Sequence, residues 1–273
     1  MPAIEVLVEG LDHPEGVAWD PATGVLWAGG EDGQLYRVDI DARTWEEAPR
    51  APGFVLGLAV DGRSRIAICC SGTGALCVLA DGAVSTLRDG FTFPNYAAFA
   101  PDGTLYFSDS GSWEADDGKV YRLSSDNELE LFSARLPHFP NGCAVTPDGR
   151  HLWIVESFAP TVNRFDLATG EVEEIARLEG TVPDGIAFTD DGGVVVSCYR
   201  PDRIVHISSG GQVEVIAEDP QGTKLGAPTN VVFVGAERDR LVSANLGRWH
   251  LTLLDVGLRG APLHYPERWA VDA

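Results

Sequence analysis

Short apolar runs alternate with polar turns along the whole chain, a pattern typical of β structure. Val, Ile, Trp, Tyr and Phe fill the runs, and Asp-Gly pairs mark many of the turns between them. The runs come in groups of four. Clear third and fourth members of these groups lie at 35–39, 119–124, 162–167, 203–208, 173–178 and 213–218. No convincing amphipathic helix interrupts them, so we predict an all-β chain.

A repeat organises these groups. Five segments open with Pro and a polar residue, then continue through small or apolar residues, a Gly-containing turn and a second apolar run. They begin at Pro14, Pro94, Pro140, Pro183 and Pro228, and a degenerate sixth begins at Val55. The residue after each leading position is number 15, 56, 95, 141, 184 or 229, which gives spacings of 41, 39, 46, 43 and 45 residues. Four strands in a unit of roughly 40–45 residues predict a β-propeller with six four-stranded blades.

The two ends of the chain are expected to close the ring. Residues 4–10 precede the first unit as an apolar run, and the last unit ends with 251–257 and a weak fourth strand. The N-terminal strand can supply the missing strand and cover an exposed sheet edge. Residues 1–273 then form one propeller domain. An open solenoid or two β-sandwiches would not explain a period kept across the chain.

Equivalent positions of the repeat should lie at equivalent places around the central channel. The position after the leading residue is occupied by Glu15, Leu56, Asn95, Asn141, Asp184 and Thr229. Four of these side chains offer oxygen donors, and two of the four are carboxylates that would be costly to bury together without a cation. We therefore predict one divalent metal ion bound by Glu15, Asn95, Asn141 and Asp184. Oxygen ligands favour calcium, with magnesium, manganese, iron(II) and zinc as alternatives. Taken singly, each Pro-Asx-Gly sequence could be only a turn.

Further site residues follow from the same alignment. Asp109 and Glu156 end second strands and are expected to hydrogen-bond and orient the ligand amides, unless they are merely rim residues. The loops around the channel mouth should wall the substrate pocket with mostly aromatic side chains. The residues expected to contact substrate are Asn95, Tyr96, Phe93, Trp113, His138, Phe158, Tyr199, Arg200, Trp249 and His250.

Charge and composition narrow the possible partners. The net charge of -21 argues against binding to nucleic acid or to anionic membranes and favours a soluble monomer or weak homo-oligomer. The N-terminus resembles no secretory signal, and no apolar stretch is long enough to span a membrane. The five cysteines lack the spacing of a zinc site and are expected to be buried free thiols, which suggests a cytoplasmic location.

At its repeat motifs the sequence resembles the regucalcin and gluconolactonase family, also called the senescence-marker-protein family. The similarity runs from Pro14-Glu15-Gly16 to Pro228-Thr229, and its most specific parts are residues 14–16, 140–142 and 183–185. The resemblance implies that Glu15, Asn141 and Asp184 bind metal and that Asn95 contacts metal or substrate. Aldonolactonases of the family usually carry Asn-Asp in the third unit, often with Arg two positions before the Asn. The run Phe93-Pro94-Asn95-Tyr96 has neither, which counts against a polyhydroxylated sugar-acid lactone and leaves the metal ligands intact.

The resemblance implies a metal-dependent hydrolase acting on a lactone or related ester. The metal would polarise the carbonyl and activate a water, and Asp184, or else Glu15, would accept the water proton. No G-x-S-x-G elbow supports a serine triad. The alternatives are phosphotriester hydrolysis or non-hydrolytic chemistry on the same metal site, and a non-catalytic propeller stabilised by metal.

Overall fold

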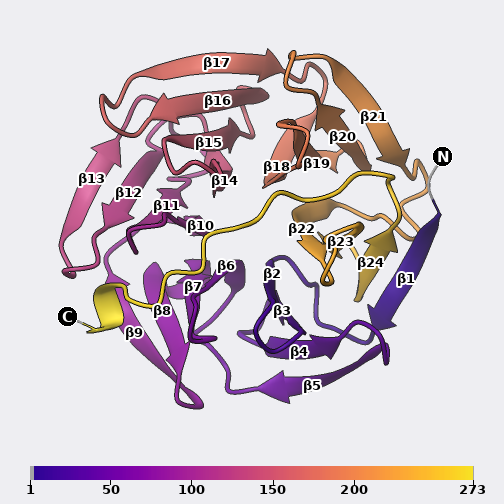
Figure 1. Cartoon of the computed structure of the whole chain (residues 1–273), viewed down its shortest axis with the longest axis horizontal. Helices are drawn as coiled ribbons and strands as arrows, with labels where there is room; N and C mark the ends of the chain where they lie inside the picture. Colours follow the sequence, from indigo (N-terminus) through magenta and orange to yellow (C-terminus); the bar gives the residue numbers. More distant parts are fainter. Residues whose placement is uncertain (1–2, 273) are drawn as a thin grey trace.

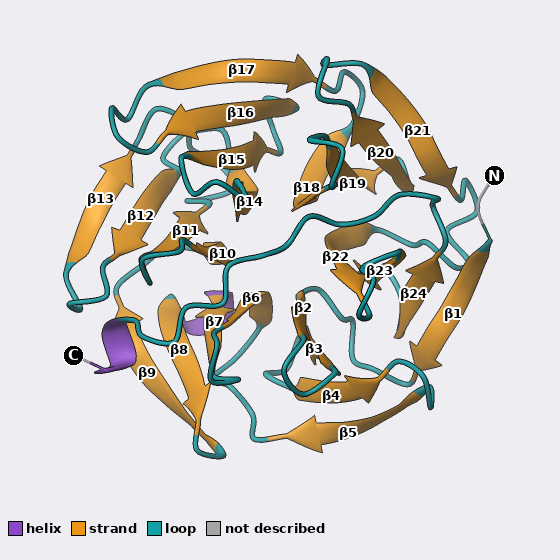
Figure 2. Ribbon diagram, viewed as in Figure 1, coloured by secondary structure: helices purple, strands orange, loops and turns teal. Residues whose placement is uncertain are grey.

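The computed structural model describes residues 3–272 and contains six antiparallel sheets of four strands each, arranged in a ring (Figures 1 and 2). The first three blades, from the innermost strand outward, are β2 (Val17–Asp20), β3 (Val25–Gly29), β4 (Leu35–Asp39), β5 (Thr44–Ala48); β6 (Val55–Val60), β7 (Ile66–Cys70), β8 (Ala75–Ala80), β9 (Ala83–Asp89); β10 (Pro94–Phe99), β11 (Leu105–Asp109), β12 (Lys119–Leu123), β13 (Leu129–Ser133). The predicted six-bladed propeller is confirmed.

The next two blades are β14 (Pro140–Val145), β15 (His151–Glu156), β16 (Thr161–Asp166), β17 (Val172–Arg177); β18 (Val182–Phe188), β19 (Val194–Arg200), β20 (Arg203–Ile207), β21 (Val213–Glu218). The sixth is β22 (Pro228–Val234), β23 (Arg240–Asn245), β24 (His250–Leu254) and β1 (Ile4–Glu9). Two short 3-10 turns, η1 (Ser71–Thr73) and η2 (Ala270–Asp272), complete the elements of the described residues.

The N-terminal strand closes the ring as predicted. β1 pairs antiparallel with β24, from Ile4 opposite Leu254 to Glu9 opposite His250. The first strand of the chain is thus the outermost strand of the last blade, and it covers an edge that would otherwise be free to pair with another chain.

Two of the Pro-x-Gly sequences, at 140–142 and 183–185, lie within the strands β14 and β18, and their glycines let neighbouring innermost strands approach closely. A Cβ on Gly142 would lie 2.2 Å from the carbonyl oxygen of Asp184, and one on Gly185 would lie 2.7 Å from the carbonyl oxygen of Thr229. Both separations are far shorter than any van der Waals contact allows. The glycines that follow Asn141 and Asp184 therefore allow these innermost strands to lie close together around the channel.

After the last strand, residues 259–272 cross the face of the propeller where the innermost strands end (Figure 1). We call this segment the strap. Its backbone bonds blade six (Gly260 N–H to the Arg238 carbonyl, 2.8 Å) and blade five (Ala261 N–H to the Phe188 carbonyl, 2.9 Å). His264 reaches the Thr146 carbonyl in blade four at 2.8 Å, and the Tyr265 hydroxyl donates to the Trp19 carbonyl in blade one at 3.1 Å.

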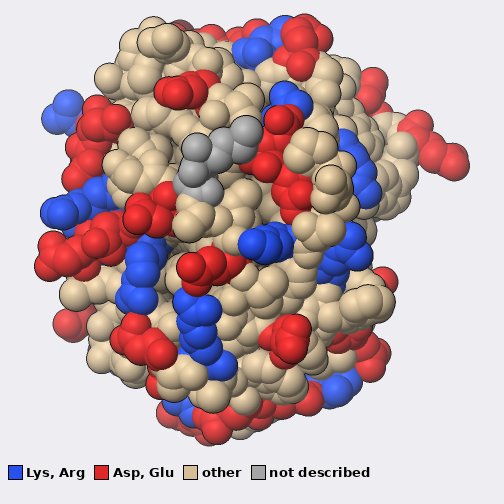
Figure 3. Space-filling view, turned by 90° about the vertical axis from the view of Figure 1, so that its right-hand side faces the viewer, with Lys and Arg blue, Asp and Glu red and all other residues tan. Residues whose placement is uncertain are grey.

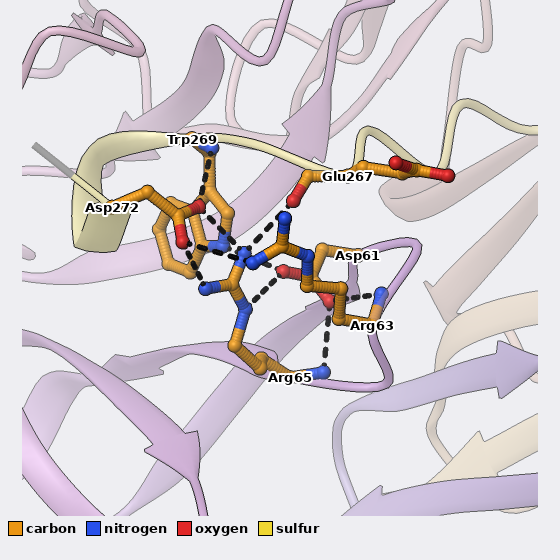
Figure 4. A network of polar contacts seen from close by, with 6 residues as sticks. All are labelled: Asp61, Arg63, Arg65, Glu267, Trp269 and Asp272. Atoms are coloured by element: carbon orange, nitrogen blue, oxygen red, sulfur yellow. Dashed lines mark hydrogen bonds and ion pairs between the residues drawn. The ribbon is translucent and has the colours of Figure 1, made fainter.

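The strap ends in a polar network on blade two (Figure 4). The Trp269 indole N–H donates to the buried Asp61 carboxylate at 2.8 Å, while Arg65 bonds both Asp61, at 2.6 Å, and Asp272, at 2.8 Å. The Trp269 ring also packs edge-on against Phe99 of blade three, with the ring centroids 5.1 Å apart. The strap therefore contacts all six blades.

The surface is acidic but mixed. On the side seen in Figure 3, carboxylates are interspersed with Arg and Lys side chains rather than gathered into a single-sign field. All five cysteines are buried and free, as predicted. Within residues 3–272, no helix has the length and apolar character needed to cross a membrane.

Candidate metal centre

The four predicted donors lie at one end of the channel, where the innermost strands begin. Glu15 lies two residues before β2, Asn95 and Asn141 are the second residues of β10 and β14, and Asp184 is the third residue of β18. Each side chain is buried, with exposures of 3% for Glu15, 2% for Asn95, 3% for Asn141 and 7% for Asp184. The strap crosses the opposite ends of the same strands.

Two serines fix the orientation of the asparagine amides. The Asn95 Nδ2 donates to Ser110 Oγ at 2.9 Å, and Ser110 in turn donates to the Pro140 carbonyl of the next blade at 2.7 Å. Asn141 repeats this arrangement in the next blade: its Nδ2 donates to Ser157 Oγ at 3.2 Å, and Ser157 donates to the Pro183 carbonyl at 2.7 Å. Since each NH₂ group is committed to a serine, the amide oxygen is the atom left available on both side chains.

These oxygens have no partner within the protein. Asn95 Oδ1, Asn141 Oδ1 and Asp184 Oδ1 are all buried and accept no hydrogen bond from the described residues. A buried polar atom without a partner costs roughly 1–3 kcal/mol. Three such atoms at the start of three consecutive innermost strands indicate a site built to bind something other than protein.

The two carboxyl groups are held in an environment that disfavours their charged forms. Burial raises the pKa of Glu15 well above its usual range, and the nearby charge of Asp184 raises it further. Burial likewise raises the pKa of Asp184 to about 7, although the neighbouring polar side chain of Asn141 partly offsets the increase. The carboxyl from blade five thus lies near enough to the carboxyl of Glu15 to disfavour its charged form.

This donor set fits a hard divalent cation. Two carboxylates would balance two positive charges, and the free amide oxygens are neutral ligands of the kind calcium prefers. Glu15, Asn95, Asn141 and Asp184 are the residues that would hold the ion.

Asp109 and Glu156 do not orient the ligand amides directly. Asp109 accepts the Phe93 N–H at 2.7 Å and the Thr92 N–H at 3.1 Å, and Glu156 accepts the His138 N–H at 2.8 Å. The two amides instead donate to Ser110 and Ser157, the residues that follow Asp109 and Glu156, because successive side chains of a strand point in opposite directions. Asp109 and Glu156 therefore fix the loops that lead into Pro94-Asn95 and Pro140-Asn141.

Asn230 is a site residue that the repeat alignment missed. The aligned sixth-blade position is Thr229, but its hydroxyl donates to the backbone carbonyl of Glu15 at 2.8 Å. The next residue, Asn230, is fully buried and donates from Nδ2 to Glu15 Oε2 at 3.2 Å, and its own Oδ1 has no partner. A signal was present in the sequence, because this position is Gly in four units and only Tyr96 and Asn230 replace it.

Replacing Asn230 with Ala is expected to weaken calcium binding about 10- to 100-fold, the usual cost of losing a side chain that orients a metal ligand. The variant leaves one Glu15 oxygen free to turn away from the channel. Isothermal titration of chelator-treated protein measures the affinity. Asn163→Ala is the matched control, since Asn163 is a buried asparagine bonded to Thr161 within blade four. Equal affinities in Asn230→Ala and wild type would show that Asn230 has no part in the site.

Aromatic side chains cluster at the same end of the molecule. Phe93 and Phe139 directly precede Pro94-Asn95 and Pro140-Asn141, and Trp113 lies 5.9 Å from Phe93 and 4.7 Å from Phe139, measured between ring centroids. Phe158 stacks on Phe139 at 4.7 Å. Trp113 is 66% exposed and Phe158 47% exposed, so this aromatic cluster offers an apolar surface beside the donors.

The other residues expected to contact substrate have varied surroundings. Half-exposed His138 pairs with Asp116 at 2.9 Å, Arg200 lies over the Tyr199 ring at 4.7 Å, and exposed Trp249 contacts the His13 ring at 5.3 Å. His250 is buried, and its ring bonds the Lys224 carbonyl at 2.9 Å. Tyr96 is also buried, below the donors, where burial raises the pKa of its hydroxyl.

A second acidic group lies at the surface near Glu15. His13 Nδ1 is 3.1 Å from an Asp12 carboxylate oxygen and 3.3 Å from a Glu31 oxygen. Asp12 also accepts a bond from Gln34 at 2.9 Å, and its pKa is lowered: bonds from His13 and Gln34 outweigh the opposing effect of burial. These contacts pair the three side chains with one another, in contrast to the unpaired oxygens inside the channel.

Sequence comparison identifies the family. The profile described as SMP-30/Gluconolactonase/LRE-like region matches residues 13–244, which include all four predicted donors and Asn230. The chain belongs to this family. Among curated proteins it is 26% identical over 204 residues to the strictosidine synthase-like 6 protein of Arabidopsis thaliana, an alignment that covers 67% of this chain and 55% of the relative. The chain thus spans about half the length of that relative.

Other relatives carry different names. The chain is 27% identical over 129 residues to lactonase drp35 of Staphylococcus saprophyticus, covering 47% of this chain and 39% of the relative. It is 23% identical over 167 residues to regucalcin of Oryctolagus cuniculus, covering 55% of this chain and 56% of the relative. The relatives therefore differ in named activity.

Solved structures share the fold over nearly the whole chain. A gluconolactonase from Xanthomonas campestris superposes with a TM-score of 0.80 at 23% identity, covering 94% of this chain and 90% of that one. A calcium-binding regucalcin from Agrobacterium tumefaciens gives 0.79 at 19% identity, covering 97% of each chain.

Proposed function

We propose that this protein is a metal-dependent hydrolase of lactones or related esters, and that the end of the channel formed by Glu15, Asn95, Asn141 and Asp184 is its active site. The observation that carries the proposal is the group of buried, unpartnered oxygens on Asn95, Asn141 and Asp184 beside a second buried carboxyl. Family relatives named gluconolactonase and lactonase support the reaction class.

A divalent cation held by these donors would polarise the substrate carbonyl and acidify a water molecule. The protein's own contribution begins with its rigid donors, because Ser110 and Ser157 hold the two amides in place before substrate arrives. Exclusion of bulk water from so buried a site strengthens every electrostatic interaction within it.

Asp184 is the better candidate for the general base. Glu15 is engaged by Asn230 at Oε2, whereas Asp184 keeps an oxygen without any protein partner. A base accepts a proton from water most effectively when its pKa is near the working pH, and burial raises the pKa of Asp184 to about 7. Asp184 would take the proton from the attacking water and return it to the leaving alkoxide.

The aromatic cluster favours a lactone with an apolar part. Phe93, Trp113 and Phe158 present ring faces and edges next to Asn95 and Asn141. Such surfaces gain little from binding the hydroxyls of a sugar acid and more from covering an alkyl or aryl substituent. Phe93 and Tyr96, which stand where sugar-acid lactonases of the family usually carry Arg and Asp, agree with an apolar substrate.

The test is a hydrolysis screen of calcium-reconstituted protein against sugar-acid lactones and alkyl-substituted lactones. We expect turnover of the alkyl-substituted group, loss on chelation, and a decrease of at least about 100-fold in kcat/KM for Asp184→Ala and Asn141→Ala. Asn163→Ala serves as control. Equal turnover of hits by wild type, Asp184→Ala and Asn141→Ala would sink the proposal. A metal-stabilised propeller without turnover would show only a change in melting temperature on chelation.

A further inference from the structure

A cavity lies in the channel on the other side of the donors, between them and the strap. Its volume is about 660 Å³, within the range of roughly 300–1,000 Å³ that is usual for small-molecule sites. The innermost strands of all six blades form its wall, and strap residues 261–265 form its floor. Tyr96 and Cys143 mark the end nearest the donors. We call this cavity the lower chamber.

The repeat keeps the lower chamber open. The position three residues after each aligned donor position faces it in every blade and is occupied by Ala18, Ala59, Ala98, Ala144, Ala187 and Val232. Larger side chains at this ring would fill the bore of the propeller. The residues that follow these positions along the innermost strands, such as Trp19, Phe99 and Phe233, are apolar as well. The chamber is therefore a mostly apolar space.

The lining also shows where the chamber opens. In blades two to five only residues of the innermost strands contribute to it. In blades one and six the lining extends to surface turns, with Pro21, Gly24 and Asp41 on one side and Gly235 and Arg238 on the other. The entrance thus lies beside the strap, between the first and last blades.

One cation stands at this entrance without an acidic partner. The Arg238 side chain is half-buried and donates from Nε to the strap carbonyl of Gly260 at 2.9 Å, and no carboxylate of residues 3–272 lies within ion-pair distance of it. Its neighbour Arg240 is already paired with Asp41 at 3.0 Å. The Tyr265 hydroxyl proton is committed to Trp19, so Arg238 is the group free to bind an anion. In a protein of charge -21, an unpaired arginine at an apolar cavity is an exception.

We propose that the lower chamber binds a small monocarboxylate with an apolar body, whose carboxylate pairs with Arg238 and whose chain extends along the alanine ring. The guanidinium presents parallel N–H groups that match a carboxylate, and the alanine wall offers apolar contact without polar groups to satisfy. A sugar or a nucleotide would lose its hydrogen bonds to water in such a space. The site is separate from the proposed active site and does not depend on hydrolysis.

Octanoate is a suitable probe, with 1-octanol as its uncharged counterpart. Isothermal titration of calcium-loaded wild type should show one octanoate site and weaker binding of octanol. Arg238→Gln should weaken octanoate binding at least about 10-fold, as expected for losing a charge-assisted hydrogen bond. Arg238→Lys should restore part of it. Arg259→Gln is the matched control, because Arg259 is a half-exposed strap arginine that pairs with Glu237 at 3.6 Å.

A second variant tests the chamber without altering charge. Ala187→Leu places a larger side chain in the wall of the lower chamber and should also reduce octanoate affinity about 10-fold or more, since the ligand and the added side-chain atoms compete for one volume. Asp184→Asn should bind octanoate as wild type does, which separates this site from the donors. Absence of octanoate binding to wild type, or affinity unchanged in both Arg238→Gln and Ala187→Leu, would overturn the proposal.

Discussion

Trp269→Ala is expected to destabilise the protein by about 3–5 kcal/mol, the usual cost of removing a fully buried aromatic side chain. Trp269 has no exposed surface, packs on Phe99 of blade three and donates to the buried Asp61 of blade two. Its loss therefore leaves a cavity and removes one of the two side-chain hydrogen bonds to Asp61 Oδ2, the other being from Arg65. Since the strap contacts every blade, the variant should also loosen the closure of the ring.

Urea-induced unfolding of wild type and variant measures this effect. Leu263→Ala is a matched control on the same strap, because Leu263 is 41% exposed and should cost less than about 1 kcal/mol. If Trp269→Ala were no more destabilising than Leu263→Ala, the Trp269 contacts of the strap would contribute little to stability, and the blades alone would hold the ring together.

Raising the pH from 5 to 8 in the presence of chelator is expected to destabilise the protein, and calcium at pH 8 should restore stability. Burial raises the pKa of both Glu15 and Asp184, so folding favours their neutral forms. The penalty is absent below the unfolded pKa of these groups. It grows from there up to the folded pKa, which is about 7 for Asp184, and levels off above it; roughly 3 kcal/mol of the Asp184 contribution falls between pH 5 and 8.

Thermal unfolding at the two pH values, with and without calcium, gives the test. Asp184→Asn is the control, because it keeps the shape of the side chain and cannot ionise; the difference between it and wild type removes the contribution of all other titrating groups. Asp272, whose pKa the Arg65 guanidinium lowers to about 2, stays charged throughout this range. A wild type that is equally stable at both pH values without metal would mean that the carboxyls are not forced together.

Much of this architecture could be predicted from the sequence because the repeat is regular. The spacing of Glu15, Asn95, Asn141 and Asp184 follows the blade period, and the short apolar runs match the observed strands closely, as at Leu35–Asp39 and Val213–Glu218. Because the blades repeat around one axis, equivalent positions in the repeat lie at equivalent places around the channel. The closing role of Ile4–Glu9 followed from the missing fourth strand of the last unit.

Other features depend on packing that no period encodes. The repeat alignment placed Asp109 and Glu156 beside the ligand asparagines. Their side chains point away from the amides, which instead donate to Ser110 and Ser157. Asn230 escaped notice because Thr229 occupies the aligned position, whereas in the structure both of these successive residues reach Glu15. The strap lies outside the repeat, so its path across the channel could be known only from the folded structure.

We propose that side chains from four blades together bind one divalent cation, and calcium titration of chelator-treated wild type, Glu15→Gln and Asp184→Asn by calorimetry tests this. We expect one site per chain in wild type, with protons released on binding at pH 7, and a loss of at least about 100-fold in affinity for each variant. Wild type that binds no calcium, or variants that bind it as tightly as wild type, would contradict the claim.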